Sequence, residues 1–516
     1  MHWHLPPNLQ KMKEQIEEAA KSCGLDFYPT AFYVVDMETM NELCANTGFP
    51  TRYSHWRFGM EYERMRKETG YGFSRFYEMV INNDPAVAYL LHYNSITQQR
   101  MVMAHVFGHV DFFKNNVCFR HTDRSMIYTM EGHRKLIEKY IDEIGFEEVE
   151  GFIDNCLSIE YLVDGFPYIK RDESEENKKG RCKCGKSAHA CKGCKHRDEK
   201  NSGSEKLPFG LPEYMRDFVD IDALVNGQRR RNEDEEVEED EDIEGRVPKN
   251  PERDVLKFLI RHTDGMPHWQ KDIISIIRNE SYYFLPQRQT KIMNEGWATY
   301  WHDYMMTEMG LAEPNGLIDY SNTMGGVIGG KVMNPYKLGY LLYQDIKERW
   351  DRGMYGKEYE EEQDALKKMQ WDTKEGNGFK KLFEVRESMN DIEFIREFMT
   401  DEFIQKMKFF TSKLDHDDNW YKIASRDPQE VRNWFIEQLV NGGQPVIEVL
   451  DGNFENSKEL LLRHVYYGQE LDNAYRDRTL ARIYRIWRRP VHIATISEGQ
   501  PVIASYNQGE IKVTKW

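Results

Sequence analysis

Two histidines four residues apart form the sharpest chemical pattern in the sequence. His105 and His109 stand in Ala-His-Val-Phe-Gly-His-Val-Asp, within a segment predicted to be helical. At about 100° per residue, their imidazoles project from one helix face, one turn apart, and can bind one metal ion. The same spacing occurs in the His-Glu-x-x-His motif of zinc peptidases, but Val106 stands where those enzymes carry their glutamate general base. A pair of structural histidines is the alternative interpretation.

A second helical segment supplies a carboxylate and a third histidine. Glu295 and His302 are seven residues apart, so two helical turns bring them within about 20° of each other on one face. Several helical zinc peptidases complete their metal site with a carboxylate from a second helix. The sequence therefore predicts that Glu295 joins the two histidines at a Zn²⁺ site, with His302 as a fourth ligand or a neighbour of the ligands. An aromatic core helix with a capped glutamate and a surface histidine is the alternative.

Because position 106 is not glutamate, another residue has to act as the general base. Glu280, on the preceding helix, is a candidate base or an additional metal ligand. An ion pair with Arg278 or Arg288 is its alternative role. Asp111 is a second candidate base, and His302 is a third. The predicted activity is metal-dependent hydrolysis of an amide bond, in which the metal lowers the pKa of its bound water toward ~7.

The same side chains also suit iron. Carboxylates and imidazoles from several helices hold one or two iron ions in helical-bundle proteins. Such a site would use Glu280, Glu295 and His302 together with the two histidines of the first helix. A non-haem iron enzyme is therefore an alternative to a zinc hydrolase.

Four clustered cysteines form a second candidate metal site. Cys182, Cys184, Cys191 and Cys194 follow the pattern Cys-x-Cys-x6-Cys-x2-Cys. Residues 178–197 also contain eight Lys or Arg residues and no acidic residue, and this positive charge favours thiolates. Thiolates at short spacing can close a tetrahedral site, so we expect a knuckle-like structural Zn²⁺ held by four thiolates, or by three and an imidazole. Loose metal capture by a flexible loop is the alternative.

The overall composition limits the other classes of function. The chain has 516 residues and a formal net charge of −17, and residues 233–244 alone hold ten Asp or Glu. Such a tract repels itself and is expected to be a solvated linker. The rest of the chain is only mildly acidic, so general nucleic-acid binding is not expected. No run of 18 apolar residues and no secretory pattern occur, so we expect a soluble, cytoplasmic protein without a membrane span.

Patterns for nucleotide binding and for serine nucleophiles are missing. Residues 323–331 are rich in glycine but lack the Gly-x4-Gly-Lys-Ser/Thr order of a phosphate loop. The sequence contains no Rossmann fingerprint and no Gly-x-Ser-x-Gly motif. Dinucleotide binding and acyl-serine chemistry are therefore not expected.

The elements that must position these residues are mostly helical. Helices are predicted over 8–24, from 60 onward, and over 95–115, 129–146, 148–162, 213–224, 252–262, 268–284, 288–309, 336–352, 358–369, 377–386, 391–407, 427–441 and 470–487. Strands are predicted over 28–35, 445–450, 459–467, 491–496, 501–506 and 511–514. The expected fold class is mainly α: a large helical domain with zincin-like paired metal-binding helices, plus a smaller C-terminal α+β domain.

Composition divides the chain into three parts. Residues 1–170 and 249–414 form the expected helical body, 171–248 a Cys-rich and acidic insertion, and 415–516 the C-terminal α+β domain. The insertion is poor in hydrophobic residues, so its composition does not extend a core around the cysteines. Zinc bound there is expected to stabilise only its own small lobe.

Six blocks of the chain are long and specific enough to compare with known families. They are PTRYSHWRFGMEYER (50–64), YEMVINNDPAVAYLL (77–91), VMAHVFGHVDFFKNN (102–116), YYFLPQRQTKIMNEGWATYWH (282–302), NPYKLGY (334–340) and ELDNAYRDRTLARIYRIWRRPVHI (470–493). These blocks closely resemble the stage V sporulation protein R family, SpoVR. The resemblance covers nearly the whole chain apart from residues 172–248.

The resemblance implies a biological process and partners. It implies a role in endospore formation, particularly in assembly of the spore cortex, although the family also occurs in bacteria that do not sporulate. It implies an AAA-type serine protein kinase and a von Willebrand-like protein as partners. A cytoplasmic scaffold or regulator of a kinase-linked sporulation pathway, without enzymatic activity, is therefore an alternative function. The Cys cluster falls outside the family pattern and is expected to be an addition to the common fold.

Overall fold

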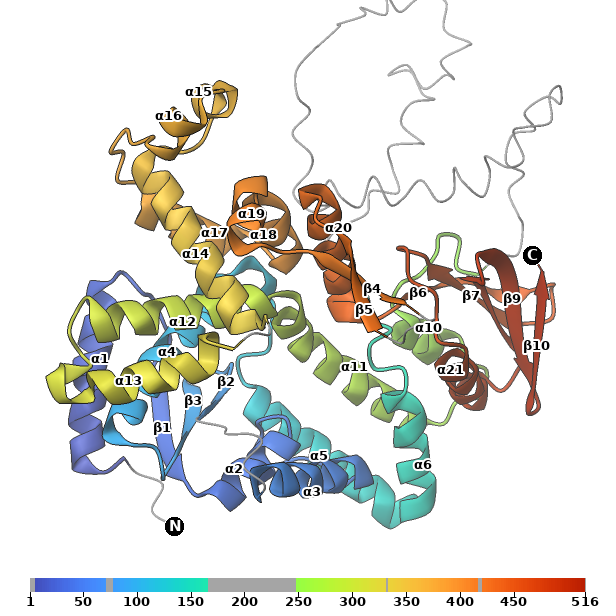
Figure 1. Ribbon diagram of the computed structural model, residues 1–516. Helices are drawn as coiled ribbons and strands as arrows, with labels where there is room; N and C mark the ends of the chain where they lie inside the picture. The colour runs from blue at the N-terminus through green and yellow to red at the C-terminus, as the bar shows by residue number, and fades with distance from the viewer. Residues whose placement is uncertain (1–4, 71–77, 166–246, 331–332, 416–419, 516) are drawn as a thin grey trace, which may run out of the picture. The chain divides into compact units, whose positions relative to one another are not determined.

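The structure is a computed structural model of the 516-residue chain (Figure 1). It describes residues 5–70, 78–165, 247–330, 333–415 and 420–515. The chain divides into two compact units, residues 1–163 with 246–516 and residues 164–245. The Cys cluster, the acidic tract and the helix predicted over 213–224 lie outside the described residues. The helices and strands named below all belong to the first unit.

Helix α4 (Ile96–Asn115) carries the two histidines and begins where the sequence predicts. The Ser95 hydroxyl accepts a hydrogen bond from the Gln98 N–H at 3.2 Å, and the Gln98 side chain accepts one from the Ser95 N–H at 2.9 Å. This reciprocal capping box satisfies two donors that a helix start otherwise leaves unpaired. Local sequence therefore sets where α4 begins.

Helix α12 (Lys291–Thr307) carries Glu295 and packs directly against α4. Gly108 of α4 faces Ala298 of α12 so closely that a Cβ atom on Gly108 would lie 2.7 Å from the Ala298 Cα. Real Cβ atoms do not approach backbone this closely, because the interior is already close-packed. The two helices therefore meet at backbone contact, and this position requires glycine.

The same helix is in backbone contact with α14 (Pro335–Arg352). A Cβ atom on Gly296 would lie 2.4 Å from the Gly339 Cα. Gly296 and Ala298 are about 200° apart around a helix, so the two contacts lie on opposite sides of α12. Helix α12 is thus held between α4 and α14, which fixes the place of the carboxylate that it carries.

A three-stranded sheet lies against α4. It consists of β1 (Thr30–Val35), β2 (Glu78–Ile81) and β3 (Ala86–Leu91) in the order β1-β3-β2. Strand β1 runs parallel to β3, and β2 runs antiparallel to it. Both β2 and β3 contact α4. The sequence predicted only β1, because β2 is four residues long and shows little alternation.

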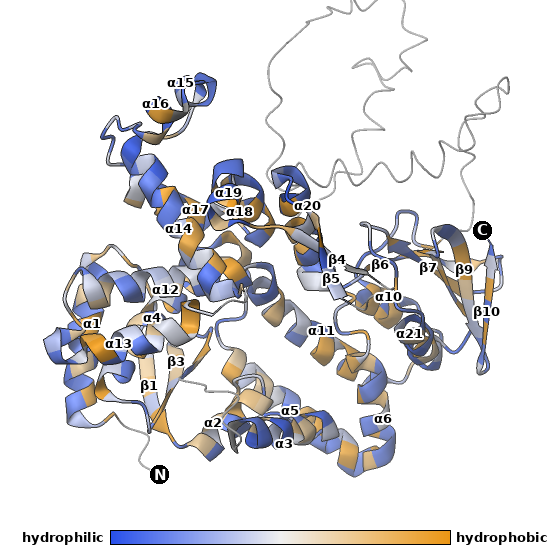
Figure 2. Cartoon of the chain, in the orientation of Figure 1, coloured by the Kyte–Doolittle hydropathy of each residue, from blue (hydrophilic) through white to orange (hydrophobic). Residues whose placement is uncertain are grey.

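Seven more helices belong to the first half of the helical body. They are α1 (Pro7–Ser22), α2 (Met37–Ala45), α3 (Trp56–Gly70), α5 (Met126–Ile144), α6 (Phe146–Leu157), α10 (Val255–His262) and α11 (His268–Gln289). The sequence predicted all of these except α2, a nine-residue helix capped by Asp36. Figure 2 shows hydrophilic and hydrophobic residues on different sides of α5 and α6, as expected for helices with one face against a core.

The second half of the helical body is more broken than predicted. Its elements besides α12 and α14 are α13 (Glu313–Ile328), α15 (Lys357–Glu361), α16 (Ala365–Met369), α17 (Gly378–Ser388), α18 (Asp391–Phe398) and α19 (Asp401–Met407). The helix predicted over 391–407 is two helices, because Thr400 caps the second one by accepting from the Phe403 N–H. The glycine-rich residues 323–328 form the last turns of α13, which agrees with the rejection of a phosphate loop.

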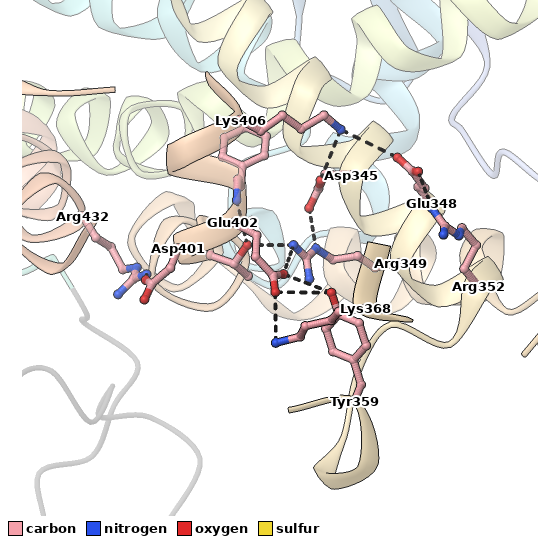
Figure 3. Close-up of polar contacts among 12 residues, drawn as sticks. Asp345, Glu348, Arg349, Arg352, Tyr359, Lys368, Asp401, Glu402, Lys406 and Arg432 are labelled. Atoms are coloured by element: carbon pink, nitrogen blue, oxygen red, sulfur yellow. Dashed lines mark hydrogen bonds and ion pairs between the residues drawn. The ribbon is translucent and has the colours of Figure 1, made fainter. Parts of the chain in front are cut away.

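An ion-pair network joins α14 to α19 (Figure 3). Arg349 donates to Asp345 on its own helix at 2.6 Å and to Glu402 on α19 at 2.7 Å. Lys368 of α16 reaches the same Glu402 at 3.2 Å. Arg349 and Asp345 are buried, so removing one of them would leave its partner as an unpaired buried charge, which is strongly destabilising. The network holds the helices in place.

The C-terminal part is a five-stranded sheet with a crossover helix. Its strands are β6 (Val446–Phe454), β7 (Glu459–Val465), β8 (Val491–Ser497), β9 (Gln500–Asn507) and β10 (Glu510–Lys515), in the order β10-β9-β8-β7-β6. Helix α21 (Asn473–Trp487) connects β7 to β8, which are parallel, as such crossovers require. Helix α20 (Pro428–Leu439) and a hairpin of β4 (Thr411–Asp415) and β5 (Trp420–Ser425) precede the sheet. The five sheet strands were all predicted; the hairpin was not.

The C-terminal sheet shares its hydrophobic core with the helical body. One cluster contains Ile153 of α6, Ile277 of α11, Val449 of β6, Ile483 of α21 and Val491 of β8, all nearly without solvent exposure. These residues belong to the same compact unit. The α+β part predicted from residue 415 onward therefore continues the core of the helical body.

Candidate metal centre

Three donor atoms from α4 and α12 converge. One atom each of His105, His109 and Glu295 lies within 4.8 Å of the other two, and all three side chains are buried. Glu295 Oε2 is 3.3 Å from His109 Nε2 and 3.7 Å from His105 Nε2. Donors around a tetrahedral ion with bonds of about 2.0–2.1 Å are about 3.4 Å apart. The spacing of the three atoms therefore fits a single metal ion.

Two of these donor atoms have no hydrogen-bond partner. Within the part of the chain that the structure describes, His105 Nε2 and Glu295 Oε2 are buried and unpaired. Buried polar atoms in proteins are nearly always hydrogen-bonded, so such atoms call for an explanation. A metal ion between them would satisfy both.

Hydrogen bonds at the other ring nitrogens orient the imidazoles. His109 Nδ1 donates to the Asn294 side-chain oxygen at 2.8 Å. His105 Nδ1 lies 2.9 Å from His302 Nδ1, and His302 Nε2 lies 3.0 Å from the Met324 sulfur. A thioether can only accept, so His302 carries its proton on Nε2 and accepts from His105 through Nδ1. His105 Nε2 therefore presents a lone pair, whereas His109 Nε2 lies 3.3 Å from Glu295 Oε2. Burial alone would lower the pKa of His109, but this carboxylate outweighs burial and raises it. A metal ion at this place would bind in place of the His109 Nε2 proton.

His302 thus contacts the candidate ligand His105 instead of joining the three donor atoms. Its place behind His105 matches the neighbour role that the sequence allowed. Burial, and then the nearby His105 and His109, hold the pKa of His302 well below its usual value, so its ring is neutral. Sequence reasoning missed Asn294 and Met324; the position of Asn294, directly before Glu295, was the available signal.

Charge at the centre is concentrated on Glu295. Burial alone would raise the pKa of this carboxyl, but His109, His105 and Lys291 together outweigh burial and hold the pKa well below its usual value. Lys291 Nζ donates to Glu295 Oε1 at 2.7 Å. Glu295 is therefore an anion with one oxygen bound by Lys291 and the other facing the histidines.

A second carboxylate and a tyrosine lie beside the centre. Glu78 Oε1, from β2, is 3.9 Å from His105 Nε2, and the Glu78 side chain is 18% exposed. Burial raises the pKa of Glu78. The Tyr336 ring, from the first turn of α14, stacks on the His105 ring with centroids 6.0 Å apart. Sequence reasoning missed both residues, because neither belongs to a metal-binding spacing.

Glu280 lies in a different cluster. It pairs with Arg52, and its other oxygen is 3.1 Å from His133 Nδ1. The expected alternative partner Arg278 is bound to Asp254 instead. Glu280 is buried, and both of its oxygens have partners. It therefore forms a structural ion pair, as the alternative interpretation expected, but with Arg52, which the sequence did not suggest.

Asp111 is also engaged away from the three donor atoms. Its oxygens accept from the Asp26 N–H and from the Trp297 indole N–H, each at 2.8 Å. Arg386 approaches it at 3.6 Å. Burial raises the Asp111 pKa to about 6 despite that guanidinium. Asp111 therefore links α4 to α12 and to the segment between α1 and β1.

The four cysteines of the predicted zinc cluster lie outside the described residues. The other four cysteines, Cys23, Cys44, Cys118 and Cys156, are free thiols. No helix among the described residues has both the length and the apolar character to cross a membrane.

Comparison with known proteins gives one curated relative. The chain is 28% identical over 498 residues to the uncharacterized protein YcgB of Escherichia coli (strain K12), which covers 92% of this chain and 89% of that protein. No solved structure matches the chain.

Two family models divide the chain between them. The model described as SpoVR-like protein matches residues 3–444, and the model of the SpoVR-like C-terminal domain matches residues 445–498. Their boundary falls directly before β6, the first strand of the C-terminal sheet. Both helices of the metal centre lie within the first match. The chain belongs to the SpoVR-like protein family.

Proposed function

We propose that the chain is a metal-dependent hydrolase that cleaves an amide bond during spore cortex formation, with Zn²⁺ held by His105, His109 and Glu295. The observation that carries the proposal is the convergence of three buried donor atoms, two of which lack another partner among the described residues. Membership of the SpoVR-like family supports the choice of process.

The donor set suits a catalytic ion. A bound divalent metal would lower the pKa of a coordinated water toward ~7. Because Lys291 holds Glu295 Oε1, Glu295 offers one oxygen, and with two imidazoles it makes three ligands. Catalytic zinc sites commonly have three protein ligands and leave the fourth position for water.

The proposed general base, in place of the missing glutamate of His-Glu-x-x-His, is Glu78. Its Oε1 atom is 3.9 Å from Nε2 of His105. Among the described residues, however, the group whose donor atoms lie within 4.8 Å of one another consists of His105, His109 and Glu295, without Glu78. A carboxylate at that place can accept a proton from water beside the donors without being a ligand. The bases predicted from the sequence, Glu280 and Asp111, have both oxygens engaged elsewhere.

Iron is the second candidate metal. Two carboxylates, Glu78 and Glu295, lie beside two imidazoles. Histidine and carboxylate sets of this kind suit non-haem iron as well as zinc. Metal analysis of the purified chain distinguishes the two.

A non-enzymatic role is the remaining alternative. In that case the chain is a scaffold or regulator that works with an AAA-type serine protein kinase and a von Willebrand-like protein, and the histidines are structural. Substitution of the ligands should then impair folding without any specific loss of function in the folded protein.

Metal content is the first test. Serine first replaces the four clustered cysteines, so that zinc bound by them does not mask the result. These are Cys182, Cys184, Cys191 and Cys194. In this background we expect His105→Ala plus His109→Ala to remove one equivalent of metal, whereas His268→Ala, an exposed histidine with 87% of its side chain accessible, removes none. Unchanged stoichiometry in the double variant contradicts the proposal.

Release of amine groups from spore-cortex peptidoglycan is the second test. Glu78→Gln should keep the metal but lower the rate by about 10²–10⁴, the usual contribution of a general base. Glu42→Gln, at an exposed position on α2, is the matched control and should leave the rate unchanged. Full activity of Glu78→Gln contradicts the role of Glu78, and a metal-loaded wild-type chain that releases no amine contradicts hydrolysis.

A further inference from the structure

A pocket of about 500 Å³ lies in the first unit, away from the metal centre. It is bounded by the end of α6, by the turn that follows α20, by β6 and β7, and by α21. The volume falls within the range of about 300–1,000 Å³ that is typical of small-molecule sites. None of the metal-centre residues lines it.

The walls of the pocket are mostly aliphatic and aromatic. The aliphatic part includes Ile159, Leu162, Val446, Ile447, Leu462 and Ile483. Three tyrosines, Tyr161, Tyr467 and Tyr475, also line it. Tyr475 is exposed, while Tyr161 and Tyr467 are half-buried. Guanidinium groups already cover one face of two of these rings: Arg288 Cζ is 4.5 Å from the centroid of Tyr161, and Arg478 Cζ is 4.7 Å from the centroid of Tyr475. The pocket therefore offers an apolar body lined by three aromatic rings, two of which already bind a cation on one side.

The charges of the lining are mainly negative. Glu437, Glu470 and Asp472 are its carboxylates, and Arg476 is its one lining cation. The Arg476 guanidinium is already bound to Asp477 at 2.7 Å and to Asn473 at 2.7 Å. Burial lowers the pKa of His464 to about 4, so this lining imidazole is neutral near pH 7. The free charge that faces a ligand is therefore negative.

Glu437 is the carboxylate without a counter-ion. Glu470 accepts the backbone N–H groups of Glu498 and Gly499, and Asp472 caps α21. By contrast, no Lys or Arg in the described ranges pairs with Glu437, whose pKa is raised by burial. A partly buried carboxylate that lacks a partner is costly, and a cationic ligand would remove that cost.

We propose that this pocket binds a small organic cation with an apolar body, of the quaternary or alkylated ammonium class. The cation would face Glu437, and the Tyr467 ring, together with the faces of Tyr161 and Tyr475 opposite their arginines, would attract it by cation–π interaction. The aliphatic walls would cover its alkyl groups. The inference does not depend on the proposed hydrolase, since none of the pocket's residues belongs to the metal centre. The pocket joins the two segments matched by the family models, so a ligand there would contact both.

Calorimetric titration of the full chain with choline and with benzyltrimethylammonium tests the proposal. The neutral isostere of choline, 3,3-dimethyl-1-butanol, measures how much of the binding depends on the charge. We expect saturable binding of at least one cation and binding of the neutral isostere weaker by about tenfold or more, given the size of desolvated cation–π interactions. Saturable binding of neither cation, or equal binding of the isostere, overturns the proposal.

Two variants locate the site. Glu437→Gln should weaken cation binding about tenfold, because it removes one charge while keeping the shape of the side chain. Glu430→Gln makes the same change of charge on the exposed face of the same helix and should leave binding unchanged. The double variant His105→Ala plus His109→Ala should bind the cation as the wild type does. Loss of binding in that variant, or equal effects of the two glutamate changes, places the cation elsewhere and overturns the proposal.

Discussion

Asn294 of α12 holds the ring of His109 of α4, through a hydrogen bond of 2.8 Å from Nδ1 to the amide oxygen. The residue next to Glu295 on one helix thus orients a histidine of the same donor cluster on the other helix. Because the acceptor is an oxygen, Nδ1 carries a proton, and Nε2 is the ring atom that faces Glu295 and would bind a metal. Two helices far apart in the sequence therefore depend on each other for the geometry of the proposed coordination site.

Asn294→Ala should weaken metal binding without removing any ligand. Loss of the partner that orients a ligating histidine typically costs about 10–100-fold in metal affinity. Competition with a chromogenic chelator measures the change. Asn433→Ala, at an exposed position on α20, is the control and should bind metal as the wild type does. If the Asn294 variant binds metal with unchanged affinity, His109 is not oriented in this way.

Gly108→Ala should destabilise the chain and reduce its metal content together. The added Cβ would lie 2.7 Å from the Ala298 Cα, so α4 and α12 must move apart. Overpacking of this kind costs about 1–3 kcal/mol. Thermal unfolding and metal analysis of the same sample check both effects.

Gly132→Ala is the matched control for that change. Gly132 lies in α5, and a Cβ there meets no atom within 4 Å. Alanine in a helix interior is favoured over glycine by about 0.5–1 kcal/mol, so this variant should be slightly more stable than the wild type. Equal behaviour of the two glycine variants would contradict close approach of α4 and α12.

His464 should make stability fall on acidification. Its pKa is lowered from 6.5 to about 4 by burial, so the folded chain keeps it neutral while the unfolded chain takes up a proton below pH 6.5. The contribution is therefore present above pH 6.5 and is lost as the pH falls toward 4. At pH 5 the loss amounts to about 2 kcal/mol by proton linkage.

His464→Gln removes this titration, and its amide can still bond to Thr495, the present partner at 3.0 Å. Urea unfolding at pH 7.5 and pH 5 should show a smaller difference for this variant than for the wild type. His268→Gln, at an exposed site, should keep the wild-type difference. The same pH dependence in all three proteins would show that His464 does not contribute.

Excision of residues 178–244, replaced by a short Gly/Ser bridge, should leave the helical body folded. Both α4 and α12, with the helices that pack on them, belong to the unit formed by residues 1–163 and 246–516. The shortened chain should keep its cooperative thermal unfolding and the metal bound by α4 and α12. Loss of cooperative unfolding would show that the insertion is integral to the fold.

The three donor residues were predicted from the spacing of histidine and glutamate residues along two predicted helices. Helical geometry places His105 and His109 on one face, and the capping box at Ser95 marks where their helix begins. Glu295 followed from a second helix with an apolar, aromatic surface. These are local properties of the sequence, which is why they could be predicted together with most helices and with the strands of the C-terminal sheet.

The residues that support the centre depend on long-range packing and could not be predicted in this way. Glu280 was a candidate base because it stands near Glu295 in the sequence, but Arg52, 228 residues away, pairs with it. Glu78 comes from a four-residue strand, and Tyr336 from the first turn of α14. Neither position has a periodic pattern, since its role is set by elements that meet only in the folded chain.

The glycines on both sides of α12 limit how this site can diversify. Gly108 lies against Ala298, and Gly296 lies against Gly339, so α12 has little freedom to shift or rotate. The backbone that carries Glu295 is therefore held in one position. A change of metal or substrate preference would therefore have to arise at residues that other elements bring to the site, such as Glu78 and Tyr336.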